Sequence, residues 1–171
     1  MIPPAEIQSP LVRALFAYWD RIRVGRFAPK WSDVQPGDIK SLLPYLIVGQ
    51  VRTNPFDFQY RIVGTAVVEA FGFDFTWETL RSPLPGSDAP SWLGLYRQFV
   101  ERRTPSFGQY RMPLSLTEMQ RVDVGIFPLS SDGVSVDRLI ELEDWWADGS
   151  LKPHATSPTA LAFTMLPAQA G

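Results

Sequence analysis

Apolar residues at helical spacing mark the first element of the chain. They recur every three or four positions between residues 11 and 22, and Ser9 and Pro10 precede them as a helix N-cap and a first helical residue. The pattern predicts a helix whose apolar face is formed by Leu11, Leu15, Tyr18, Trp19 and Ile22. Two interpretations stay open: this face packs on its own domain, or it also forms the interface of a homodimer.

The pattern then changes to that of strands. Residues 45–52 are rich in isoleucine and valine, and residues 57–63 alternate between apolar and polar side chains. Asn54-Pro55 between them is a turn signal. These features predict a β-hairpin with one buried face.

Helical spacing returns twice in the middle of the chain. Thr65 opens a short segment, AVVEAF, that ends at Gly72. After a loop-like stretch over residues 73–89, Pro90 opens a longer segment with apolar residues at helical positions from 92 to 99. We therefore expect one short helix and one longer helix between the two groups of strands.

Three further strands are predicted after these helices, over residues 107–116, 119–129 and 134–142. Asp132-Gly133 is a strong hairpin signal between the last two. The following residues are rich in alanine, serine, threonine and proline, which predicts a largely disordered tail. The expected division is an N-terminal extension over 1–8, a domain over 9–146 and a tail over 147–171.

Two strands, then helices, then three strands favour an α+β fold built on an antiparallel sheet. One face of that sheet would carry the middle helices. The other face would need the N-terminal helix, a partner or water.

Composition removes several kinds of chemistry from the 171-residue chain. It has no cysteine, which excludes disulfides, thiol catalysis and thiolate metal sites. Its one histidine, His154, lies in the predicted tail, and the net charge of -2 gives no attraction to nucleic acid. No secretory signal and no membrane-length apolar run is visible, so we expect a cytoplasmic protein that binds neither membrane nor nucleic acid.

Acidic residues gather near the end of the last predicted strand. They are Glu141, Glu143, Asp144 and Asp148. We interpret them as a solvated strand end, with a docking surface for a basic partner as the alternative. Their spacing matches neither a calcium loop nor an acid–base pair.

Several strings of the sequence resemble the PAS domain superfamily, and in particular a divergent branch of short stand-alone proteins common in alphaproteobacteria. The most specific is Tyr60-Arg61-Ile62-Val63-Gly64-Thr65 followed by Phe71-Gly72. Weaker matches are Tyr18-Trp19, Pro36, Leu42-Leu43-Pro44, and Phe127-Pro128-Leu129 before Asp132-Gly133. The resemblance covers about residues 12–145, and Trp77 stands where the family pattern has a glycine.

This resemblance implies a five-stranded antiparallel sheet of spatial order 2-1-5-4-3 with helices on one face. It also implies a sensory or signalling module, without catalysis, that binds a small ligand or a signalling protein partner and acts as a homodimer. PAS haem sensors use a histidine on a central helix and flavin photosensors use a cysteine. This chain has neither there, so haem and cysteinyl-flavin chemistry are not expected, and the cofactor is unknown.

A ligand site in such a fold would lie between the sheet and the middle helices. The residues expected to line it are Tyr60, Thr65, Phe71, Trp77, Trp92, Tyr96, Tyr110 and Arg111. Two alternatives remain: a protein-interaction scaffold whose core is filled by these aromatic residues, and an enzyme on an α+β cone-like fold.

Overall fold

The computed structural model describes residues 9–82, 89–113, 119–145 and 160–165. Three α-helices and six strands are present there, with three short 3-10 turns between α1 and β1. They are α1 (Pro10–Arg23), β1 (Leu46–Thr53), β2 (Phe56–Val63), α2 (Thr65–Phe71), α3 (Ala89–Arg102), β3 (Ser106–Pro113), β4 (Met119–Leu129), β5 (Arg138–Asp144) and β6 (Ala160–Met165).

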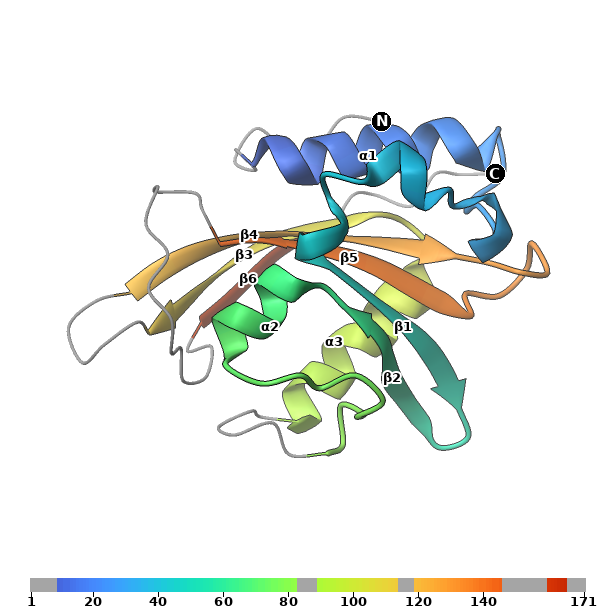
Figure 1. Cartoon of the computed structure of the whole chain (residues 1–171). Helices are drawn as coiled ribbons and strands as arrows, with labels where there is room; N and C mark the ends of the chain where they lie inside the picture. Colours follow the sequence, from blue (N-terminus) through green and yellow to red (C-terminus); the bar gives the residue numbers. More distant parts are fainter. Residues whose placement is uncertain (1–8, 83–88, 114–118, 146–159, 166–171) are drawn as a thin grey trace.

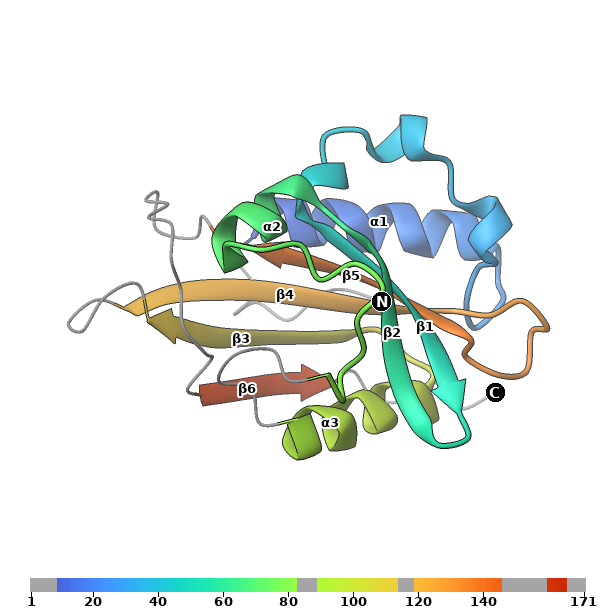
Figure 2. The ribbon, with the colours of Figure 1, turned by 60° about the horizontal axis from the view of Figure 1, so that its bottom comes forward.

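The strands form one antiparallel sheet of order β2-β1-β5-β4-β3-β6 (Figure 2). The expected α+β fold and the strand order 2-1-5-4-3 are confirmed. The sixth strand differs from expectation, because residues 160–165 pair with β3 although they fall in the predicted tail. The predicted extension over 1–8 lies outside the described residues, as does the rest of the predicted tail.

Both faces of the sheet are covered (Figure 1). On the first, which we call the α1 face, α1 buries Leu15 and Trp19 against Phe107, Phe127 and neighbouring apolar residues of the central strands. On the second, the α2/α3 face, a separate core joins the two middle helices to all five strands from β1 to β5. Residues of β5 therefore meet packed protein on both sides.

The start of α1 follows the sequence prediction. Ser9 is the N-cap, its hydroxyl accepts a hydrogen bond from the Val12 N–H at 3.0 Å, and Pro10 is the first helical residue. The helix ends at Arg23. The expected helix and its first residue are thus confirmed.

The apolar face of α1 belongs to the core of its own chain. Leu15, Tyr18 and Trp19 are buried there, and Leu11 and Ile22 are half-buried beside them. This placement corrects the expectation that all five side chains form a dimer interface: three of them have no free surface to offer. It favours the first of the two interpretations of the stripe.

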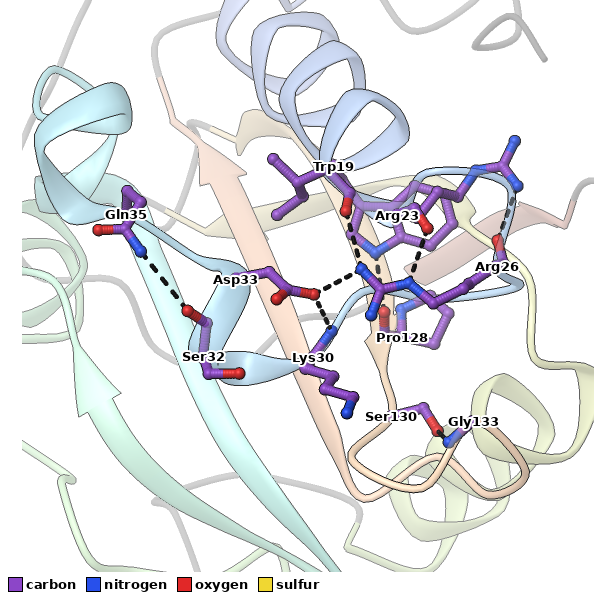
Figure 3. A network of polar contacts seen from close by, with 11 residues as sticks. Trp19, Arg23, Arg26, Lys30, Ser32, Asp33, Gln35, Pro128, Ser130 and Gly133 are labelled. Atoms are coloured by element: carbon purple, nitrogen blue, oxygen red, sulfur yellow. Dashed lines mark hydrogen bonds and ion pairs between the residues drawn. The ribbon is translucent and has the colours of Figure 1, made fainter.

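Polar contacts hold the end of α1 on the sheet (Figure 3). The Trp19 indole N–H donates to the Pro128 carbonyl at 2.8 Å. Farther along the chain, the Arg26 guanidinium donates to the Asp33 carboxylate at 2.6 Å, and the Lys30 N–H donates to the same carboxylate. These hydrogen bonds lower the pKa of Asp33, the backbone one first. These bonds close the turn after α1, and the Ser130 N–H donates to the Pro29 carbonyl at 2.9 Å, which holds this segment beside the end of β4.

The last hairpin differs in detail from the prediction. The strand begins at Arg138 instead of Val134, which is exposed in the loop. Leu139 faces the α2/α3 core, whereas Ile140 and Leu142 face α1. The loop extends over several residues because Asp132 binds the backbone N–H groups of Val134 and Ser135, both at 2.8 Å.

Gly64, at the start of α2, allows the backbone to approach another segment closely. A Cβ added there would lie 2.2 Å from the Pro44 carbonyl oxygen. The Gly64 N–H also donates to the Leu46 carbonyl at 2.7 Å. Any larger residue would therefore push apart the start of α2 and the 3-10 turn that precedes β1. Within the described ranges, no helix is long and apolar enough to cross a membrane.

Candidate functional site

Two glutamates point from β5 into the α2/α3 core. Glu141 pairs with Ile126 of β4 and Glu143 pairs with Val124, and both of these partners belong to that core. Side chains directly opposite each other in antiparallel strands share a face, so both carboxyls lie under the helices. Their exposed fractions are only 2% for Glu141 and 7% for Glu143.

This burial overturns the interpretation of the acidic cluster as a solvated strand end. Asp144 is also buried, on the α1 face, and Asp148 lies outside the described residues. None of the three described acids offers a free surface to a basic partner. The docking-surface alternative therefore fails for them as well.

Three buried tyrosines surround the glutamates. The Tyr96 hydroxyl of α3 donates to Glu141 Oε2 at 2.8 Å. The Tyr110 hydroxyl of β3 is hydrogen-bonded to the Glu143 carboxyl, and the Tyr60 hydroxyl of β2 is hydrogen-bonded to that of Tyr96. The carboxyls are thus held by two neutral hydroxyl groups, from α3 and β3, and a third hydroxyl, from β2, is hydrogen-bonded to the first of these.

Several polar atoms on this face have no hydrogen-bond partner among the described residues. They are Glu141 Oε1, Glu143 Oε2, Ser106 Oγ and Trp145 Nε1. Ser106 pairs with Ile126 across β3 and β4, which places it on the same face, and Trp145 belongs to the same core. Buried polar groups nearly always have a partner, either a protein group, an ordered water or a ligand, so these four atoms mark the place on this face where a water or a ligand would be held.

Burial raises the pKa of Glu141 to about 8, with the neighbouring Glu143 charge adding to the rise and the Tyr96 hydrogen bond opposing it. Burial likewise raises the pKa of Glu143 to about 7. In the described part of the chain, no basic side chain is hydrogen-bonded or ion-paired to either carboxyl. Both groups therefore exchange protons close to neutral pH.

The tyrosines remain protonated and act as donors. Burial, followed by the Glu141 charge, raises the pKa of Tyr96 well above its usual value. Burial and the Glu143 charge do the same for Tyr110. We therefore describe the site as two proton-exchanging carboxyls in a shell of neutral hydroxyls and aromatic rings, and name it the Glu141–Glu143 cluster.

Five of the eight residues expected to line a ligand site lie on the α2/α3 face. Tyr60, Tyr96 and Tyr110 form part of the Glu141–Glu143 cluster. Phe71 and Trp92 are half-buried at its margin: Phe71 stacks edge-on against Trp145 with ring centroids 5.4 Å apart, and Trp92 lies 6.3 Å from Tyr96.

The other three expected residues are not brought into this cluster. Thr65 is exposed, and so is Trp77, with 59% of its surface open and Arg61 stacked on its ring at 4.1 Å. The expectation that these two line an interior site is therefore corrected. Arg111 lies on β3 opposite Arg121, but its side chain lies outside the described part of the structure.

The glutamates themselves were missed because a polar strand end normally faces water. A signal was present: Leu139, Glu141, Glu143 and Trp145 occupy alternate positions, so the two acids share a face with two large apolar residues. This alternation, together with the prediction that helices cover the sheet, indicates that the two carboxyls are buried.

The opposite face of the sheet carries a second acidic pair, Asp144 of β5 and its neighbour Asp123 of β4, which binds the N-terminus of α1. Ser9 Oγ donates to Asp144 Oδ2 at 2.5 Å, and the Ser9 N–H donates to Asp123 Oδ2 at 2.9 Å. Arg121 pairs with Asp123 at 3.0 Å. Adjacent residues of β5, Glu143 and Asp144, thus contact the cluster on one face and the start of α1 on the other.

The described residues offer no ligand set for a metal ion. No group of three or more histidine, cysteine, aspartate or glutamate side chains that could hold a metal ion occurs in residues 9–82, 89–113, 119–145 and 160–165. Two carboxyls alone are few for a cation such as calcium, which takes six to eight oxygen ligands.

Comparison with known proteins agrees with this architecture. No curated protein matched the chain. The family described as PAS domain matches residues 7–141, which includes the helices, strands β1 to β4, and Glu141 on β5. The match spans most of the 171 residues, and the order of strands β1 to β5 is the one this resemblance implied. The chain belongs to the PAS domain family.

Proposed function

We propose that the chain is a sensory module that binds a small molecule at the Glu141–Glu143 cluster and relays binding to a protein partner or a second copy of itself. The observation that carries the proposal is the set of four buried polar atoms without a partner on the α2/α3 face, among the described residues. A polar ligand would supply partners to atoms that otherwise lower the stability of the fold.

Strand β5 offers a route for the relay. A ligand that moves Glu143 also acts on Asp144, the next residue, whose carboxylate accepts from Ser9 at the start of α1. Leu11 and Ile22 of α1 are half-exposed and could contact a partner if the helix shifted. No catalytic step is proposed, and a cytoplasmic location remains an expectation.

A ligand-free scaffold is the second candidate, favoured by the close aromatic packing on the same face. Phe58 lies 4.8 Å from Tyr96, and Tyr60 lies 4.8 Å from Phe75, between ring centroids. Rings at these separations gain from their mutual contact without any ligand. In that case the chain would act only through its outer surface.

Thermal unfolding in the presence of four compound classes separates the two candidates. The classes are small amines, small carboxylates, uncharged alcohols and nucleotides, each tested on the wild type and on Glu141→Gln. A compound present at 100 times its Kd should add about 2.7 kcal/mol to the free energy of unfolding. A rise in Tm with any class that is lost in Glu141→Gln supports the sensor. No rise with any class favours the scaffold.

A further inference from the structure

When both glutamates are ionised, three of the four open atoms of the Glu141–Glu143 cluster are hydrogen-bond acceptors. We propose that the cluster binds a small primary amine in its protonated form, with the ammonium group donating to Glu141 Oε1, Glu143 Oε2 and Ser106 Oγ. This inference rests on the proposed ligand-binding function and names its ligand class.

The number of acceptors matches an ammonium group. Tyr96 and Tyr110 each occupy one side of a carboxyl, which leaves one oxygen open on Glu141 and one on Glu143. The Ser106 hydroxyl, fully buried, adds a third acceptor on the same face. An alkylammonium has three N–H donors and accepts nothing, so the number of its donors equals the number of open acceptors.

Charge favours a cation over the other ligand classes. An ionised carboxyl buried without a positive partner is strongly unfavourable, and no basic side chain in the described residues pairs with either glutamate. A bound ammonium would supply that missing positive charge. A carboxylate or phosphate ligand would instead add a third negative group to the pair.

The surroundings favour an organic cation of small size. Aromatic rings of Tyr60, Tyr96, Tyr110 and Trp145 belong to the same core, and such rings attract cations through their faces. Glu141 and Glu143 are two residues apart on one strand, which places their Cα atoms about 7 Å apart. A single ammonium with a short alkyl chain can therefore contact both carboxyls.

Binding should be linked to protons. The titratable and charged groups that face the pair are Tyr60 from β2, Tyr96 from α3 and Tyr110 from β3, with Asp57 acting on Tyr60. The tyrosines stay neutral, so the glutamates are the groups that must lose protons to receive a cation. The apparent affinity should then rise about tenfold per pH unit for each proton released, below the pKa values of the pair.

The test is calorimetric titration of the full chain with propylamine, ethanolamine, 1-propanol and propionate at pH 6, 7 and 8. Proton release is measured separately with a pH indicator in weakly buffered solution. We expect both amines to bind, protons to be released, and affinity to rise with pH. Glu141→Gln should weaken amine binding at least tenfold, whereas Glu101→Gln, which removes an exposed glutamate from α3, should not.

Circular dichroism of each variant shows whether it is folded. Tyr96→Phe is a second variant: it removes the hydrogen bond that lowers the pKa of Glu141, so proton release on amine binding should persist to higher pH than in the wild type. Binding of propanol or propionate without the amines, abolished by Glu141→Gln, would overturn the amine proposal and leave the sensor intact. Amine binding without proton release, or with unchanged affinity in Glu141→Gln, would also overturn it. Failure of every compound class would contradict the proposed function itself.

Discussion

Because two glutamates are buried, we expect the protein to lose stability as the pH rises from 5 to 8. The pKa of Glu141 is about 8 and that of Glu143 about 7 in the folded chain, against an ordinary value of 4.5. Between pH 4.5 and the raised pKa of each group, the folded state holds a proton that the unfolded state has released. The free energy of unfolding therefore falls as pH rises, which is opposite to the behaviour of a carboxylate stabilised by an ion pair.

The size of the effect follows from the same shifts. Each group that is protonated only in the folded state contributes a slope of about -1.4 kcal/mol per pH unit. Two such groups act together from about pH 5 to 7, and Glu141 alone continues to about pH 8. The total is several kcal/mol, a large part of the 5–15 kcal/mol by which domains of this kind are typically stable.

Urea unfolding at pH 5, 6, 7 and 8 measures this dependence directly. The chain suits the experiment because it has a single histidine, so few other groups titrate in this range. The double variant Glu141→Gln/Glu143→Gln should have a nearly constant free energy of unfolding and should be the more stable protein at pH 8. The matched pair of exposed residues, Glu69→Gln and Glu101→Gln, should keep the wild-type slope. A wild-type stability that is constant or increases from pH 5 to 8 would refute the reasoning.

Three further changes test the fold that holds the site. Gly64→Ala places a Cβ 2.2 Å from the Pro44 carbonyl oxygen and should lower the free energy of unfolding by about 1–3 kcal/mol. Gly37→Ala, which has open space around the added Cβ, should change this free energy little. Equal effects of the two variants in urea unfolding would contradict the close approach at Gly64. Leu15→Ala removes a fully buried side chain of the α1 face and should reduce the free energy of unfolding by about 2–5 kcal/mol. A loss below about 1 kcal/mol would argue that α1 is not packed as described. Ser9→Ala removes the N-cap hydroxyl of α1 and also a donor to the buried Asp144 carboxylate, so it should reduce the free energy of unfolding by about 2–4 kcal/mol, with faster amide hydrogen exchange in the first turn of α1; unchanged exchange there would contradict the cap.

Local patterns in the sequence predicted most of the elements. The cap at Ser9 and the helical spacing after it placed α1, because a helix start depends on a few adjacent residues. Alternation and turn signals indicated the strands. Their spatial order came from the family resemblance, since which strands become neighbours depends on contacts between distant parts of the chain.

What the sequence did not reveal also depends on such contacts. β6 was interpreted as tail because its composition resembles that of the residues around it, and it is a strand through pairing with β3. Glu141 and Glu143 were interpreted as solvated because a polar strand end normally faces water, although they alternate with Leu139 and Trp145 on a face that proves to be covered. Trp77 was expected to line the site between sheet and helices, yet it is exposed and its backbone has a φ of 78°, a conformation that glycine adopts more easily.

The central claim is that Glu141 and Glu143 form a buried, proton-exchanging pair that a cationic ligand ionises. Carbon-13 NMR of the glutamate side-chain carboxyls, assigned with the two Gln variants, measures their titration directly. We expect midpoints near pH 8 for Glu141 and 7 for Glu143 in the free protein. Saturating propylamine should move both midpoints to lower pH. Midpoints near 4.5 in the free protein, or midpoints that propylamine leaves unchanged, would contradict this claim.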